Sequence, residues 1–407
     1  MFSYSYRACY QLLNTSAIEK ISMRYLVKVF TEHFAFGLTI PFTVVWMLEK
    51  GLTLPEVGVI QAIIFFSTFL LEVPTGVVAD KFGRKNSILV GTISHVIALT
   101  IFVIAPTFLL FAISAVLTGA AWALISGAEE AYIDDTLVPT QNLSYKQLFS
   151  RVIIADESST ILGMLTGTVL VGYWGLQAPL IFAVLSMILA ALVLFLFLPK
   201  DAQPIDDNDV IIESPSDLKT TLTKYKKFVP LFIVLAILFE SARMLWQPAL
   251  VSQGWSVAQL GVIFAGLKIF SLLGSFVAEE IEYISVSVLG FVGVIGGLAL
   301  LGLSSQSATL GLIGLSFYFF LENILRINQS SYLLEIIPNK KEKATFLSGS
   351  SLIRNITSSA MSPILGWGAS YSMGFVLVGL TVLKAGSALM LKSTSQQIKQ
   401  DHSASPL

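Results

Sequence analysis

The stretch EVPTGVVADKFGRKNSIL, from Glu72 to Leu89, places a dense group of charges between two apolar segments. The charged residues are Asp80, Lys81, Arg84 and Lys85, and two glycines, Gly76 and Gly83, are spaced around them. A short basic loop between two long apolar segments is typical of two membrane-spanning helices joined on one side of a bilayer. We therefore expect a span to end near residue 79 and the next to begin near Asn86.

The composition of the whole chain agrees with a membrane location. The 407 residues are 55% hydrophobic and 13% charged, whereas soluble globular proteins carry roughly 25% charged residues. Apolar runs of about 20 residues recur along almost the whole length, and they lack the alternation of a membrane β-barrel. The sequence predicts an all-α polytopic membrane protein.

Several other classes of protein are disfavoured by the same composition. The net charge of −1 provides no general attraction to nucleic acid. The single cysteine, Cys9, rules out an internal disulfide, and the three histidines have no metal-ligand spacing. No glycine loop for ATP and no nucleophile–base motif is recognisable, so we expect neither an enzyme nor a cofactor or metal.

Twelve spans are predicted, in two blocks of six around one long polar linker. They cover roughly 23–48, 56–79, 86–105, 108–133, 148–172, 175–198, 228–252, 257–280, 284–303, 308–336, 345–370 and 372–391. The predicted domains are an N-terminal six-helix bundle (1–198), a linker (199–227), a C-terminal six-helix bundle (228–392) and a tail (393–407). Lys and Arg of the short loops gather on one side, and Lys50 alone lies opposite. This bias predicts a cytoplasmic-membrane protein with both termini in the cytoplasm.

An internal repeat relates the two blocks. KGLTLPEVGVI (50–60) follows the first span, and QGWSVAQLGVI (253–263) follows the seventh. Gly51, Gly58, Val59 and Ile60 recur as Gly254, Gly261, Val262 and Ile263, 203 positions later. Two pseudo-symmetric six-helix halves in parallel are typical of rocker-type transporters.

The segment from Gly76 to Lys85 matches G-x-x-x-D-[RK]-x-G-[RK]-[RK], and with it the chain resembles the major facilitator superfamily over nearly its whole length. The resemblance implies alternating access, with a brace on the cytoplasmic side that breaks as the protein opens inward. Its implied gating residues are Gly76, Asp80, Lys81, Gly83, Arg84 and Lys85, with Asp134 and Asp135 as partners of Arg84. We expect Gly76 to allow close helix approach and Gly83 a tight reversal, whereas topology alone accounts for Lys81 and Lys85. The second half lacks the motif, because Glu279 and Tyr283 stand at the repeat positions of Gly76 and Asp80.

Ionisable groups inside spans are costly and often functional. Our candidates for proton coupling are Glu32, His33, Glu240 and Glu322. Our candidates for the substrate cavity are Glu129, Glu130, Arg243, Asn323, Arg326, Arg354 and Trp246. Glu240–Arg243 and Glu322–Arg326 are equally compatible with ion pairs that only hold helices together. Glu32 is the preferred proton carrier because an apolar cavity favours a protonated carboxyl group, and His95 is expected to be a hydrogen-bonded structural histidine.

These residues favour a proton-coupled secondary transporter that exports a small organic molecule. Gly163, Gly167 and Gly172 form a partial version of the glycine motif of drug–proton antiporters, or simply a helix-packing face. The alternatives are a proton symporter that imports an organic anion, sugar or other nutrient, favoured by the arginines, and a non-transporting membrane receptor or scaffold. The expected partners are the substrate, protons and lipid, and the expected oligomeric state is a monomer.

Overall fold

The computed structural model describes residues 23–133, 137, 145–199, 223, 229–280, 292, 295–296, 298–299, 301–304, 307–336, 340–380 and 382–383. These residues form helices and no strand, as predicted. Two compact units are present. The first unit comprises Met1–Pro41 and Ser67–Ile212, and the second comprises Phe42–Phe66 and Glu213–Leu407. The domain boundaries predicted at the linker fall largely outside the described residues and stay a prediction.

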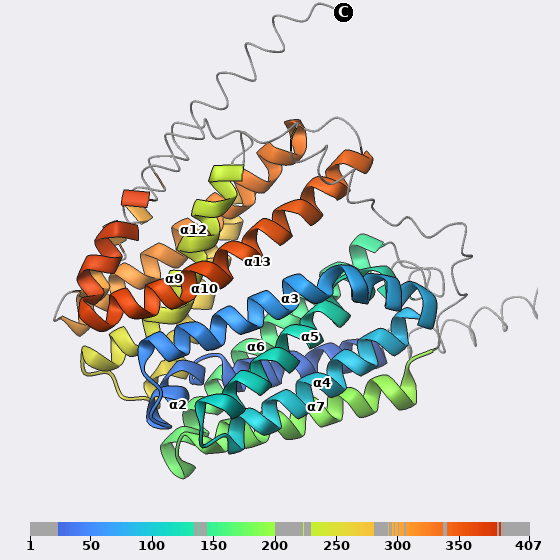
Figure 1. Cartoon of the computed structure of the whole chain (residues 1–407), viewed down its shortest axis with the longest axis horizontal. Coiled ribbons are helices and arrows are strands. Elements are labelled where there is room, and N and C mark those ends of the chain that lie inside the picture. The colour runs from blue at the N-terminus through green and yellow to red at the C-terminus, as the bar shows by residue number, and fades with distance from the viewer. Residues whose placement is uncertain are drawn as a thin grey trace, which may run out of the picture. The chain divides into compact units, whose positions relative to one another are not determined.

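The first unit is built from long apolar helices. They are Met23–Thr39, the second part of α3 (Leu54–Phe82), α4 (Arg84–Ile104), α5 (Phe108–Tyr132), α6 (Tyr145–Trp174) and α7 (Gln177–Phe197). In Figure 1, α4 lies beside both α5 and α7, and α6 also packs on α7. Large apolar side chains such as Phe182, Leu189 and Leu196 of α7 point outward and are about half exposed, as expected for a surface that faces lipid.

The second unit contains α2 (Thr43–Glu49), the first part of α3, α9 (Val229–Ser252), α10 (Gln259–Glu280), a short 3₁₀ helix η3 (Leu301–Ser304), α12 (Ala308–Ile336) and α13 (Lys340–Tyr371). Helix α10 packs on α12, and α9 packs on α13 (Figure 1). Each predicted span apart from the ninth and the twelfth coincides with a described helix. The ninth lies mostly outside the described residues, and only part of the twelfth is described, as a helix over 373–380.

The first span is broken, which the sequence analysis did not predict. Helix Met23–Thr39 and α2 are bent by 46° on either side of Pro41. Proline removes a backbone donor and clashes with the preceding turn, so a helix usually bends or ends there. The N–H groups of Val44 and Val45 at the start of α2 donate to the side chain of Gln247 on α9, at 3.0 and 3.3 Å. A side chain thus satisfies backbone donors, which are costly to leave unpaired inside a membrane.

The internal repeat is confirmed in structural detail. Gly51 and Gly254 both adopt a left-handed backbone, with φ of +90° and +97°, where a Cβ would be strained. In the first copy the N–H of Thr53 donates to Glu56 at 2.7 Å. In the second copy the N–H of Ser256 donates to Gln259 at 2.9 Å. Both copies therefore end one helix with glycine and begin the next with a capping box.

Helix 23–39 and α6 approach each other through glycines. A Cβ added to Gly163 of α6 would lie 2.4 Å from the carbonyl oxygen of Phe34, and one added to Gly37 would lie 2.2 Å from the carbonyl oxygen of Thr160. Small residues permit this backbone-to-backbone contact, which substitutes for the hydrophobic effect inside a membrane. Gly163 thus serves the packing role that was one of its two predicted roles.

Gly163→Ala should therefore destabilise the first unit, although alanine is the better helix former by about 1 kcal/mol. The added methyl group must push two backbones apart, which costs about 1–3 kcal/mol. Thermal unfolding of the purified chain in detergent measures the effect. Gly172→Ala, on the same helix, is the control, because its Cβ meets no described atom within 4 Å. Equal unfolding temperatures for the two variants would contradict this packing role.

Candidate functional site

The signature segment forms the turn from α3 to α4. Gly83 has a φ of +93° and caps α4, so the predicted tight reversal is confirmed. Arg84 donates to the carbonyl oxygen of Ala131 in the last turn of α5, at 3.0 Å, and lies 4.0 Å from the carboxylate of Asp80. A Cβ at Gly76 meets no described atom within 4 Å, so the expected close approach there stays a prediction. Asp134 and Asp135 lie outside the described residues.

The two lysines of the signature have different surroundings. Lys81 is exposed, as a simple topology signal would be. Lys85 is buried, and its ammonium donates to the carbonyl oxygens of Leu198 at 2.5 Å and Phe195 at 3.3 Å. These carbonyl oxygens lie at the carboxyl end of α7, where helical carbonyls lack intrahelical partners and attract cations. Lys85 therefore has a packing role that topology alone does not explain.

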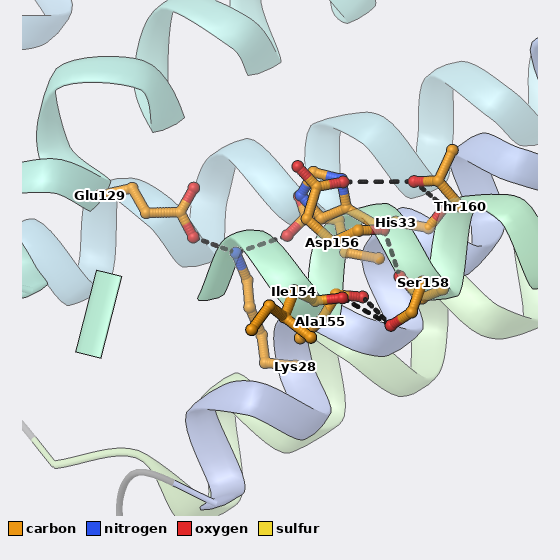
Figure 2. Close-up of polar contacts among 10 residues, drawn as sticks. Lys28, His33, Glu129, Ile154, Ala155, Asp156, Ser158 and Thr160 are labelled. Atoms are coloured by element: carbon orange, nitrogen blue, oxygen red, sulfur yellow. Dashed lines mark hydrogen bonds and ion pairs between the residues drawn. The ribbon is translucent and has the colours of Figure 1, made fainter. Parts of the chain in front are cut away.

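A buried charge cluster lies deeper in the first unit, around Lys28. The ammonium of Lys28 is 2.5 Å from Oε2 of Glu32, one turn away on the same helix, and 2.7 Å from Oε1 of Glu129 on α5. Lys28 is fully buried and Glu32 is 3% exposed. Figure 2 shows Lys28 reaching across from its helix to Glu129. One cation faces two carboxylates, so their formal charges sum to −1.

Tyr25 completes the surroundings of the Lys28 ammonium. Its hydroxyl group donates to Oε1 of Glu129 at 2.8 Å, the oxygen that also accepts from Lys28. The Lys28 ammonium also lies 6.0 Å from the centre of the Tyr25 ring, a distance at which a cation is attracted to an aromatic face. We call Tyr25, Lys28, Glu32 and Glu129 the Lys28 cluster.

A second pair of titratable groups lies one residue further along the helix. Nδ1 of His33 is 2.5 Å from the carboxylate of Asp156 on α6, and Thr160 donates to the same carboxylate at 3.2 Å (Figure 2). The close contact between Gly37 and Gly163 brings these two helices within reach of each other. Histidine changes its charge near physiological pH, so this pair can take up and release a proton.

The structure therefore brings three of the predicted residues to one place and adds three others. Glu32, His33 and Glu129 come together in the first unit, whereas Glu130 is exposed. Lys28, Tyr25 and Asp156 were not among the predicted site residues. The spacing of Lys28 and Glu32, four apart on a helix, was the signal that could have identified Lys28.

The predicted residues of the second unit have mixed outcomes. Arg243 donates to Gln61 at 2.8 Å and lies over the ring of Phe65. Asn323 donates to Ser271 and Ser275 of α10, at 2.7 and 2.5 Å, and so holds α12 against α10.

Three more of these predicted residues have described side chains. Trp246 is buried and stacks on Phe264, the hydroxyl group of Tyr318 donates to the carboxylate of Glu322, and Arg354 is exposed. The side chains of Glu240 and Arg326 lie outside the described part of the chain. Within the described part of the chain, no group of three His, Cys, Asp or Glu residues could hold a metal ion.

His95 differs from its expected structural role. The imidazole is 5% exposed, and within the described part of the chain neither Nδ1 nor Nε2 has a hydrogen-bond partner. Its neighbours are aromatic: the ring of Phe36 lies edge-on at 5.6 Å and that of Trp122 at 6.5 Å. The prediction of a hydrogen-bonded histidine is therefore wrong.

Comparison with known proteins identifies the family. The family model of the Major Facilitator Superfamily matches residues 27–363. The chain belongs to the major facilitator superfamily. An uncharacterised transporter of this superfamily, YxaM of Bacillus subtilis (strain 168), is 23% identical over 375 residues, which cover 86% of this chain and 90% of YxaM.

Solved structures of transporters share the fold at low sequence identity. A mutant form of the nucleoside transporter NupG superposes with a TM-score of 0.77 at 12% identity, covering 93% of this chain and 99% of NupG. A bacterial homologue of the human lysosomal transporter Spinster, inward-facing and unoccupied, has a TM-score of 0.73 at 14% identity, with coverages of 95% and 98%. The chain is therefore a multi-pass membrane transporter of the superfamily, with its all-α fold.

The Lys28 cluster makes a direct prediction for stability. Lys28→Met leaves the buried carboxylate of Glu32 and the partly buried one of Glu129 without their cation, and the loss of one partner of a buried ion pair typically costs about 3–5 kcal/mol. Lys28→Met/Glu129→Gln removes one of the two negative charges and should recover much of that loss. Thermal unfolding in detergent at neutral pH compares the variants. If Lys28→Met unfolds at the wild-type temperature, or if the second substitution recovers nothing, then the cluster does not stabilise the fold in this way.

Proposed function

We propose that this superfamily transporter exports a small organic cation in exchange for protons. The observation that supports the proposal is the buried Lys28 cluster, in which two carboxylates share one lysine. Its formal charge is −1, and the His33–Asp156 pair beside it adds a third carboxylate. A buried excess of negative charge attracts protons and organic cations.

Exchange follows from the cost of adding charge in a membrane interior. With one of its carboxyl groups protonated the Lys28 cluster is neutral, so a substrate cation that enters it would leave a net charge of +1, which the surrounding low dielectric disfavours. The cost falls if a proton leaves a carboxyl group, Lys28 or His33. Conversely, a proton that binds one of these groups weakens the attraction for the cation. Protons and substrate thus compete for the same buried charges, which is the requirement for antiport.

The signature turn is proposed to control the conformational change. Arg84 connects α4 to the last turn of α5 through Ala131, and Asp80 lies beside Arg84. These contacts support a brace that holds one end of the first unit in place. We retain as predictions that this end is cytoplasmic, as are both termini, that Asp134 and Asp135 complete the brace, and that the transporter is a monomer.

Import of an organic anion by proton symport is less well supported. An anion would require a cation that faces the substrate, and Lys28 already lies between two carboxylates. Arg243 in the second unit donates to Gln61 and covers Phe65, and Arg354 is exposed. Since arginine is the side chain best suited to bind carboxylates, Arg243 is the described residue of the second unit that would best support this alternative.

Proteoliposomes that contain a pH-sensitive dye test the direction of exchange. Addition of organic ammonium cations outside should release protons from the lumen, measured against liposomes without protein. Glu129→Gln should lower this exchange by about 100-fold or more, the lower end of what a positioned proton-transfer group typically contributes. Glu49→Gln is the control, because Glu49 is an exposed carboxylate on α2.

Two results would contradict the proposal. In the first, Glu129→Gln exchanges protons for cations at the wild-type rate, so that the carrier lies elsewhere. In the second, organic anions move together with protons while cations have no effect, which favours symport through Arg243.

A further inference from the structure

The first unit already holds one ammonium group in a specific environment, and that group belongs to the chain itself. Lys28 Nζ is 2.5 Å from Glu32, 2.7 Å from Glu129 and 6.0 Å from the centre of the Tyr25 ring. Two carboxylates and an aromatic face are the groups that recognise free organic ammonium ions in proteins. The surroundings of Lys28 therefore define a site for an ammonium ion.

A second observation lies on another helix, where His95 of α4 is 5% exposed and has two ring nitrogens without a hydrogen-bond partner among the described residues. A neutral imidazole carries one donor and one acceptor, and more than nine in ten buried polar groups in proteins are paired. Oε2 of Glu32 also lacks a hydrogen bond of proper geometry among the described residues, although the Lys28 ammonium is close. The two ring nitrogens of His95 thus remain available to a bound molecule, whereas Oε2 of Glu32 is held by the Lys28 ammonium.

These two side chains lie close to each other through Phe36. Phe36 is four residues after Glu32 on the same helix, about 6 Å along its axis, and its ring contacts the imidazole of His95 at 5.6 Å. The same ring lies 5.5 Å from that of His33, and Trp122 of α5 covers another side of His95. His95 therefore lies beside an aromatic ring, that of Phe36, whose residue is about one helical turn from Glu32.

We propose that the transported molecule is an amine whose ammonium displaces that of Lys28 from Glu32 and Glu129, while a neutral hydrogen-bonding group on its body binds His95. Phe36 and Trp122 would contact the apolar part between the two polar ends. Lys28 then acts as a tethered competitor, which neutralises the carboxylates whenever no substrate is bound. This inference rests on the proposed export of cations and specifies which cations are recognised.

The proposal predicts discrimination between amines that differ in a single hydroxyl group. A site whose buried polar group is designed to meet a hydroxyl discriminates against the analogue that lacks it, because the protein group is then left unpaired. Tyramine and phenethylamine are such a pair: both carry an ammonium and an aromatic ring, and only tyramine carries the ring hydroxyl. We expect the purified full-length protein in detergent to bind tyramine at least about tenfold more tightly by isothermal titration calorimetry.

Two substitutions in α4 test whether His95 causes the preference for tyramine. His95→Phe keeps an aromatic ring but removes both nitrogens, so it should abolish the preference and leave the binding of phenethylamine within about twofold. Thr100→Val, on the same helix, is the control, since Thr100 is exposed and its hydroxyl donates to the carbonyl oxygen of Val96 in its own helix. It should keep the preference.

Lys28→Ala provides an independent test of the competition. Removal of the tethered ammonium should raise the affinity for both amines about tenfold. In the same variant, propylamine should raise the unfolding temperature by more than it does in the wild type. If this variant does not fold, the comparison of His95→Phe with the wild type still decides the role of His95.

The possible failures can be distinguished from one another. Equal affinity for the two amines in the wild type, or an equal loss of both in His95→Phe, would show that His95 has only a structural role. Unchanged affinity in a folded Lys28→Ala variant would refute the competition. If amines bind and exchange for protons without a preference for tyramine over phenethylamine, the proposed export of cations stands and only the role of His95 is wrong. If no organic cation binds, the proposed function itself fails.

Discussion

Lys28 is fully buried in the first unit. Its ammonium group therefore depends for its partners on the side chains that helix packing brings next to it. A lone ammonium would cost several kcal/mol in such a position, so Glu32 and Glu129 must both stay close to it. Glu32 is fixed by the helix that it shares with Lys28, but Glu129 belongs to α5 and must be positioned by packing. Tyr25 contributes to this positioning, because its hydroxyl group bonds Glu129 and its ring packs beside that of Tyr132. The requirement to pair Lys28 therefore constrains how helix 23–39 and α5 pack together.

The last turn of α5 connects this cluster to the signature turn. Glu129 contacts Lys28, the carbonyl oxygen of Ala131 accepts from Arg84, and the hydroxyl group of Tyr132 donates to the carbonyl oxygen of Pro199 at 2.8 Å. Lys85 bonds the same end of α7. Glu129 is therefore only two or three residues from Ala131 and Tyr132, which contact α4 and the end of α7. A change in the charge around Glu129 takes place close to these contacts. This proximity gives the proposed exchange a physical route from proton binding at Glu129 to the signature turn.

The fold was largely predictable from the sequence, because the relevant signals are local. Continuous apolar runs determine the spans, and Gly83 and the repeated Gly51 and Gly254 each mark a backbone conformation that other residues rarely adopt. The bend at Pro41 was not predicted, although proline was a visible warning. Whether a proline bends a span depends on a partner for the freed donors, and here that partner, Gln247, is 203 positions away from Val44.

The candidate site was predictable only in part. Glu32 and His33 stood out because charges are rare in apolar helices, and Lys28 could have been paired with Glu32 from its spacing. The contacts of Glu129 with Lys28 and of Asp156 with His33 join helices about 100 residues or more apart in sequence. Such contacts depend on helix packing, which no local pattern specifies. Lys85 and His95 are two more examples. Both residues stood out in the sequence, but the contact of Lys85 with the end of α7 and the contacts of His95 with Phe36 and Trp122 depend on helix packing.

The central claim is that protons and an organic cation compete for the buried charges around Lys28. It can be tested directly by mixing the purified transporter with a bound organic ammonium ion in weakly buffered solution and following the pH with an indicator dye. Binding should release protons from the wild-type protein, and the release should be strongly reduced in Glu129→Gln at equal saturation with the cation. Binding without proton release in the wild type, or an undiminished release in Glu129→Gln, would contradict the account.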